Sequence, residues 1–359
     1  MALQGKTDGA VKFLLVTAAL FVVLAGIKTA ATLLVPFLLS TFIAIICNPL
    51  VVKAAHYKIP KPVAVVFVIG IFVSIALSLA GLVGNSLNEL SQLIPEYRAQ
   101  LQEHFVWLTQ QLDAYNIKIS SDLLIEYFDP SAAMGLAANM LSGLGGVMAN
   151  LFLIIITVIF MLFEASSVSH KLHLALDDPQ ARIKQIDQFL ASVNNYLAIK
   201  TLVSIATGII VSTMLWAFGL DFYLLWGVLA FLLNYIPNIG SIIAAVPAMS
   251  LAVLQLGPAA AGLIGLGYLT INTVMGNVVE PRYLGRGLGL STLVVFISLI
   301  FWGWLLGTVG MLLSVPLTMI IKIALENSAE GSWFAVLLSS EDSGETSSVQ
   351  PSEVVSKND

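Results

Sequence analysis

The chain has 359 residues, of which 58% are hydrophobic and only 10% are charged, and its mean hydropathy is +0.93. A soluble domain is about 25% charged, so these values exclude a single soluble core and predict that lipid solvates much of the chain. The single cysteine, Cys47, excludes an intrachain disulfide, and the net charge of −5 gives no reason to expect a nucleic-acid partner.

Apolar stretches long enough to cross a bilayer, about 20 residues each, recur along the chain. They predict an all-α integral membrane protein, a polytopic helical bundle with about eight crossings. No cleavage pattern of small residues follows the first stretch, so we interpret it as an anchor. The candidate spans are Lys12–Ile27, Thr29–Leu50, Pro62–Leu87, Val147–Phe163, Leu202–Phe218, the divided pair Phe222–Ile236 and Ser241–Leu256, Ala259–Val279, and Leu290–Ile321.

The positions of Lys and Arg in the short connections predict the orientation of the chain. These residues gather at the N-terminus, after the second span, after Phe163 and after Val279. The predicted crossings place all four groups on one side, which we expect to be the cytoplasm. The last run, Leu290–Ile321, either crosses once with a strong tilt or folds as a hairpin broken near Gly307–Gly310.

The connection after the third span should lie on the outer side and is amphipathic. Apolar residues from Leu87 to Leu112 recur every three or four positions, which predicts a helix about 40 Å long. Ser120–Asp122 and Asp129-Pro130 predict the caps of two further short helices. The apolar stripe can cover the membrane surface, the helical bundle or the same stripe of another subunit; the third choice predicts a homo-oligomer built through residues 87–112.

The segment after the fourth span predicts another amphipathic helix. Asp178 is a suitable cap, Pro179 suits the first turn, and apolar residues from Ile183 to Leu197 form one face that we expect to lie along the inner membrane surface. After Glu326 the apolar pattern ends, and we expect residues 340–359 to be disordered. The predicted units are the N-terminal spans 1–87, the outer helical region 88–146, a span with its inner helix 147–200, a transport core 201–326 and a tail 327–359.

Known enzyme signatures are missing from the sequence. It has no G-x-x-x-x-G-K-[ST], which excludes ATP hydrolysis by a P-loop, and neither H-E-x-x-H nor G-x-S-x-G. His170 and His173 have no acidic or cysteine partner nearby, so we interpret them as a solvated pair. We expect no enzymatic activity, no cofactor and no metal site.

Two groups of polar or helix-breaking residues interrupt the apolar spans. In the first, Pro237 removes an amide donor and Gly240 permits unusual dihedral angles. Freed backbone groups in a membrane need protein or a watered cavity beside them, and broken helices of this kind supply binding groups in secondary transporters. An ordinary tight turn at the membrane surface is the alternative. The candidate substrate-binding residues here are Asn234, Tyr235, Pro237, Asn238 and Gly240.

The second group surrounds the end of the span Ala259–Val279. Asn272 needs an internal partner within an apolar span, and Asn277 and Glu280 follow at its cytoplasmic end. Glu280 either pairs with Arg282 or Arg286, which fixes the helix end, or takes up a coupling proton. We therefore treat Asn272, Asn277 and Glu280 as candidate substrate-binding residues, and Glu280, Arg282 and Arg286 as a candidate coupling or ion-pair group.

The motifs around these residues resemble the autoinducer-2 exporter family of bacterial permeases. The resemblance covers nearly the whole chain. The motifs that carry it are Tyr235-Ile-Pro-Asn-Ile-Gly240, Asn277–Pro281, Leu284–Phe296, Phe301–Gly307 and Gly310–Pro316.

The resemblance implies a multi-pass protein of the bacterial inner membrane that exports a small signal molecule, autoinducer-2 (AI-2), and assembles as a ring-like homo-oligomer such as a pentamer. Other members of the family resemble sodium/proton antiporters, so fold alone does not identify the solute. AI-2 is small, polyhydroxylated and uncharged, which suits amides and hydroxyls. An antiporter needs carboxylates within its spans, whereas Glu164, Asp221 and Glu280 fall near predicted span ends. An uncoupled channel or scaffold is the third interpretation.

Overall fold

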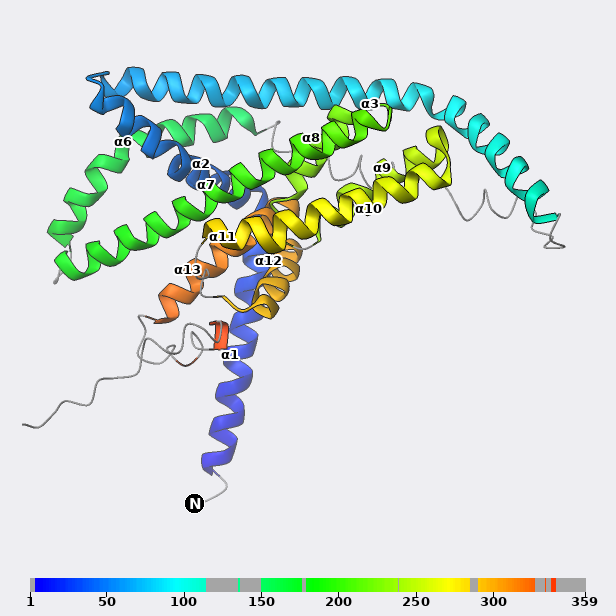
Figure 1. The fold of residues 1–359 in the computed structure, drawn as a ribbon. Coiled ribbons are helices and arrows are strands. Elements are labelled where there is room, and N and C mark those ends of the chain that lie inside the picture. The colour runs from blue at the N-terminus through cyan, green and yellow to red at the C-terminus, as the bar shows by residue number, and fades with distance from the viewer. Residues whose placement is uncertain are drawn as a thin grey trace, which may run out of the picture.

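The computed structural model describes residues 4–113, 135, 150–175, 179–237, 239–284, 290–326, 333 and 337–339. Every regular element in these residues is a helix, which confirms the all-α polytopic prediction (Figure 1). Five of the described helices are long and apolar enough to cross a membrane, and four shorter ones are apolar. The elements are α1 Gln4–Thr29, α2 Ala31–His56, α3 Lys61–Asp113, α6 Leu151–Ala175, α7 Pro179–Ala217, α8 Tyr223–Leu233, α9 Gly240–Leu256, α10 Pro258–Val274, the π-helix η1 Met275–Val279, α11 Glu280–Leu284, α12 Thr292–Leu312 and α13 Ser314–Glu326.

Helix α3 is one helix of 53 residues; in Figure 1 most of it runs along the upper edge, and its cyan C-terminal part bends downward. The helix predicted over Leu87–Leu112 is confirmed, and it continues the third span without a break. No proline interrupts the chain between Pro62 and Pro95, and glycines at 81 and 84 are tolerated within the helix. The short helices predicted near Ser120 and Asp129 lie outside the described residues.

Helix α7 also joins two elements that the sequence suggested were separate. The predicted inner-surface helix and the fifth span form one helix of 39 residues, because neither proline nor glycine occurs between Pro179 and Gly208. Part of the apolar face that was expected to lie along the inner membrane surface packs inside the protein instead. Val193 and Leu197 of this face are buried in an apolar cluster that includes residues of α2, α12 and α13. Lys200 lies at this junction, within α7, and its side chain is buried against other parts of the protein.

The four helices α7 to α10 pack so that each is antiparallel to the one before it. At one end, the Gln255 side chain accepts a hydrogen bond from the Asp221 amide and donates one to the Gly219 carbonyl, which ties the end of α9 to the α7–α8 turn. At the other end lie the α8–α9 connection, residues 234–239, and the start of α11 at Glu280. The core between them is formed by large apolar side chains such as Trp226 and Ile264.

Helices α7 and α8 approach closely where Gly208 faces Gly227. A Cβ atom at Gly227 would overlap the Ser212 hydroxyl and lie 2.8 Å from the Gly208 carbonyl oxygen. Small residues allow backbones to approach in membrane helices, which increases the van der Waals contact between them. The two glycines therefore fix the distance between α8 and α7.

The final apolar run is a hairpin, as one of the two sequence interpretations predicted. The backbone leaves helical geometry at Gly307, with φ 69° and ψ −151°, and the chain then folds back. The Trp302 indole donates to the Thr318 hydroxyl on α13 at 3.0 Å, and Gly310 packs directly against the Trp302 carbonyl. The break thus lies within the predicted Gly307–Gly310 segment.

Candidate functional site

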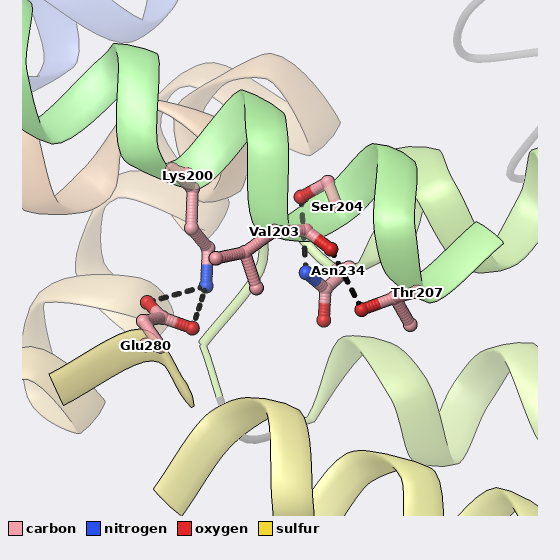
Figure 2. Close-up of polar contacts among 6 residues, drawn as sticks. All are labelled: Lys200, Val203, Ser204, Thr207, Asn234 and Glu280. Atoms are coloured by element: carbon pink, nitrogen blue, oxygen red, sulfur yellow. Dashed lines mark hydrogen bonds and ion pairs between the residues drawn. The ribbon is translucent and has the colours of Figure 1, made fainter. Parts of the chain in front are cut away.

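One turn of α7 brings together the two polar groups that were identified in the sequence. Ser204 lies four positions after Lys200 and three after Thr201, so its side chain is a neighbour of both on the helix surface. Lys200, Thr201 and Ser204 each bond to a different polar residue from elsewhere in the chain: Glu280, Tyr235 and Asn234 respectively. We call these six residues the Lys200 cluster; Figure 2 shows four of them.

The ion pair between Lys200 and Glu280 is the most buried charge contact of the cluster. The ammonium donates to both carboxylate oxygens at 2.8 Å, and the two side chains are 3% and 17% exposed. Removing two charges from water is costly, and their attraction offsets that cost only with good geometry. An ionisable pair inside the spans of a charge-poor chain is therefore a functional hypothesis by default.

Glu280 directly follows the π-helix η1, which interrupts the regular winding of the span. A π-turn inserts one residue into the helix and rotates all that follows, so it determines which face Glu280 occupies. Asn277 lies within η1 and is exposed, and Arg282 beyond it is also exposed. Glu280 is paired with Lys200, not with Arg282, and Arg286 lies outside the described residues.

The other half of the cluster comes from the end of α8. The Asn234 amide donates to the Ser204 hydroxyl at 3.0 Å, and both residues are buried. The Tyr235 hydroxyl donates to the Thr201 hydroxyl at 2.7 Å, and its ring stacks edge-on against Phe231. These bonds attach the α8–α9 connection to α7 through side chains rather than backbone.

The rest of the α8–α9 connection is a tight turn. The Ile239 amide donates to the Pro237 carbonyl at 2.7 Å, and the Gly240 amide donates to the Ile236 carbonyl at 3.3 Å. A Cβ atom at position 240 would overlap the Leu233 carbonyl, so glycine lets α9 start against the end of α8. Asn238 lies outside the described residues. Pro237 and Gly240 therefore shape the turn that holds Asn234 and Tyr235.

Asn272 does not join the cluster in the described part of the chain. It is half-buried on α10, and its side-chain oxygen lies beside Gly276. Of the candidates identified in the sequence, the structure thus gathers Asn234, Tyr235 and Glu280 around one turn of α7, and it leaves Asn272 and Asn277 apart from it.

Sequence reasoning missed the α7 side of the cluster. Lys200 was counted among the cytoplasmic charges next to a span, and Thr201 and Ser204 were not singled out. A signal was available, because Lys200 stands alone in the run from Tyr196 to Ser204, where the remaining residues are apolar or hydroxyl-bearing. Its buried neighbour Tyr196, one turn earlier, lies within electrostatic range of Glu280 and Tyr235.

Long apolar helices, a broken hairpin and a buried polar cluster define an α-helical membrane protein, and the family match identifies its class as a transporter. The chain belongs to the AI-2E transporter family, whose model, described as AI-2E family transporter, matches residues 14–330.

Three bacterial relatives match this chain over 83–97% of their own length. The chain is 46% identical to the AI-2 transport protein TqsA of Escherichia coli K12, over 93% of this chain and 97% of that protein. It is 44% identical to a putative transport protein of Haemophilus influenzae, over 90% of this chain and 95% of the relative. The putative transport protein YueF of Bacillus subtilis is 27% identical over 81% of this chain and 83% of its own length.

Proposed function

We propose that this protein exports a small, uncharged, hydroxyl-bearing signal molecule, AI-2, across the bacterial inner membrane without hydrolysing ATP. The observation that carries the proposal is the Lys200 cluster, in which hydroxyls, an amide and a neutralised charge pair converge inside apolar helices. The relation to a protein named for AI-2 transport supports the choice of solute.

The chemistry of the cluster suits a neutral polyol. Thr201, Ser204 and Tyr235 carry hydroxyls that donate and accept, so a sugar-like solute can exchange its bonds to water for bonds to them. The Lys200–Glu280 pair carries no net charge but offers a strong donor and a strong acceptor. The Tyr235 ring packs edge-on against Phe231, so the hydroxyl of the cluster has an apolar neighbour.

The orientation and assembly of the protein are part of the same proposal. With the N-terminus in the cytoplasm, the α8–α9 connection and Glu280 open toward the inner side, where a signal made in the cell arrives. The amphipathic stretch 87–112 of α3 begins against the chain's own core at Leu87, Leu90 and Leu93, and its remainder supplies the contact between subunits of a homo-oligomer.

The export proposal predicts that Asn234→Leu lowers AI-2 export at least about tenfold, because the Ser204 hydroxyl loses its amide partner and the apolar side chain cannot bond the solute. The measurement is the distribution of AI-2 between cells and medium, in a strain that lacks the native exporter and carries each variant. The matched control is Thr270→Val on α10, an exposed position whose hydroxyl bonds only its own helix. An AI-2 distribution unchanged by the wild-type protein would remove AI-2 from the proposal.

A sodium/proton antiporter is the second candidate, and one observation favours it. Glu280 lies within the span Pro258–Tyr283 and is largely buried, whereas Glu164 and Asp221 are exposed. A carboxylate that exchanges its lysine partner for sodium or a proton would couple the two ions at this site. The hydroxyls and amide around it favour a polar solute over a bare cation, so we place antiport second.

A further inference from the structure

A cavity lies away from the Lys200 cluster, where the first half of α2 meets the start of α6 and the α12–α13 hairpin. Its volume is about 390 Å³, within the range of small-ligand sites. It shares no residue with the Lys200 cluster. Its walls come from α2 between Ala31 and Leu39, from Asn150 and Ile154, and from Leu306–Val309.

A proline within continuous helix α2 and a break in α12 border this cavity. Pro36 within α2 has no amide proton, so it cannot supply the bond that a regular helix would donate to the Thr32 carbonyl, and both residues line the cavity. On the opposite wall, Gly307 adopts a left-handed φ of 69° that interrupts α12, and open space lies beside it. Broken backbone at membrane depth is tolerated where it lines a cavity that satisfies its polar groups.

The side chains around the cavity define the class of ligand. Thr32 and Thr308 contribute hydroxyls and Asn150 an amide, while the remaining walls are apolar, among them Val35 and Leu306. No charged side chain lines the cavity among the described residues. An ion would therefore lack a counter-charge, whereas an uncharged solute with several hydroxyls meets the Thr32 hydroxyl on one wall and the Thr308 hydroxyl on the opposite wall.

We propose that this cavity is a second binding site for a small, uncharged, hydroxyl-bearing solute. The proposal rests on the proposed function, since a polyol that crosses an apolar bundle needs hydrogen-bonding partners at more than one point of its route. The site between Pro36 and Gly307 supplies such partners on the hairpin side of the molecule, and the Lys200 cluster supplies them at the α8–α9 connection.

The test uses cysteine protection in the full-length protein in detergent. Thr308→Cys and, as a second position, Thr32→Cys place a thiol in the cavity, and Ala55→Cys places one at the exposed end of α2. The wild-type chain gives the background, because its single cysteine is buried. AI-2 at about ten times its dissociation constant should slow maleimide labelling about tenfold at the two cavity positions and leave labelling at Ala55→Cys unchanged.

Two results would overturn the cavity proposal: labelling at both cavity positions that AI-2 does not slow, or equal slowing at Ala55→Cys, which would indicate a general change in shape. If wild-type protein still exports AI-2 in either case, the proposed function stands and only the cavity proposal falls. If the wild-type protein exports no AI-2, the proposed function itself is wrong.

Discussion

Replacing Glu280 with leucine should destabilise the protein by about 3 kcal/mol or more, because the substitution leaves a buried ammonium without its carboxylate. Lys200 is 3% exposed and gives both of its short bonds to Glu280, and the described neighbours Thr201 and Tyr235 carry no charge to replace it. The measurement is equilibrium unfolding of the purified protein in detergent, followed by helical circular dichroism. AI-2 export should be lost as well.

A double variant separates the structural role of the pair from its role in transport. Adding Lys200→Met to Glu280→Leu removes the unpaired charge, so most of the lost stability should return while AI-2 export stays low. Glu164→Leu is the control, because Glu164 pairs with Lys171 on an exposed surface and should leave stability unchanged. A Glu280→Leu variant as stable as wild type would show that the pair does not hold α11 to α7, and full export by the double variant would remove the pair from the transport site.

Gly227→Val should destabilise the protein by a similar amount. The new Cβ atom would overlap the Ser212 hydroxyl and meet the Gly208 carbonyl at 2.8 Å, so α8 must move away from α7. Overpacking of this kind costs about 1–3 kcal/mol, and more where backbone rather than a flexible side chain is in the way. We expect the yield of monodisperse protein to fall sharply, with a lower unfolding midpoint, as measured by size-exclusion chromatography and thermal unfolding.

Gly262→Val provides the matched control for this crossing. Gly262 lies within α10, is exposed and has open space where a Cβ atom would be placed, so valine there changes only the local preference for helix. Near-equal yields of the two variants would contradict the claim that the protein needs the close approach of α7 and α8 in order to fold. Because α8 ends at Asn234, a shift of α8 would also separate Asn234 from Ser204.

The sequence predicted the helical spans well because each depends on local features. Apolar runs of sufficient length determine the spans, and Pro237 and Gly307 determine where two of them turn back. The continuity of α3 and α7 was not predicted. In both, a change from apolar to amphipathic residues suggested a boundary, but no residue there prevents helix formation.

The site was predicted in part. Asn234, Tyr235 and Glu280 stood out as polar residues in apolar surroundings, but their partners on α7 depend on tertiary packing. Lys200 and Glu280 are 80 positions apart, and only the antiparallel arrangement of α7 to α10, with the π-turn of η1, brings them into contact. A lysine near a span end normally extends to the membrane surface, so the sequence alone indicated a solvated charge.

Flux of AI-2 through the purified protein in sealed liposomes tests the central claim most directly. We predict that wild-type liposomes loaded with AI-2 release it much faster than liposomes carrying Asn234→Leu, while a pH-sensitive dye inside them shows no proton movement when sodium is added. AI-2 that stays inside wild-type liposomes, together with a sodium-driven change of internal pH, would contradict the account and favour sodium/proton antiport.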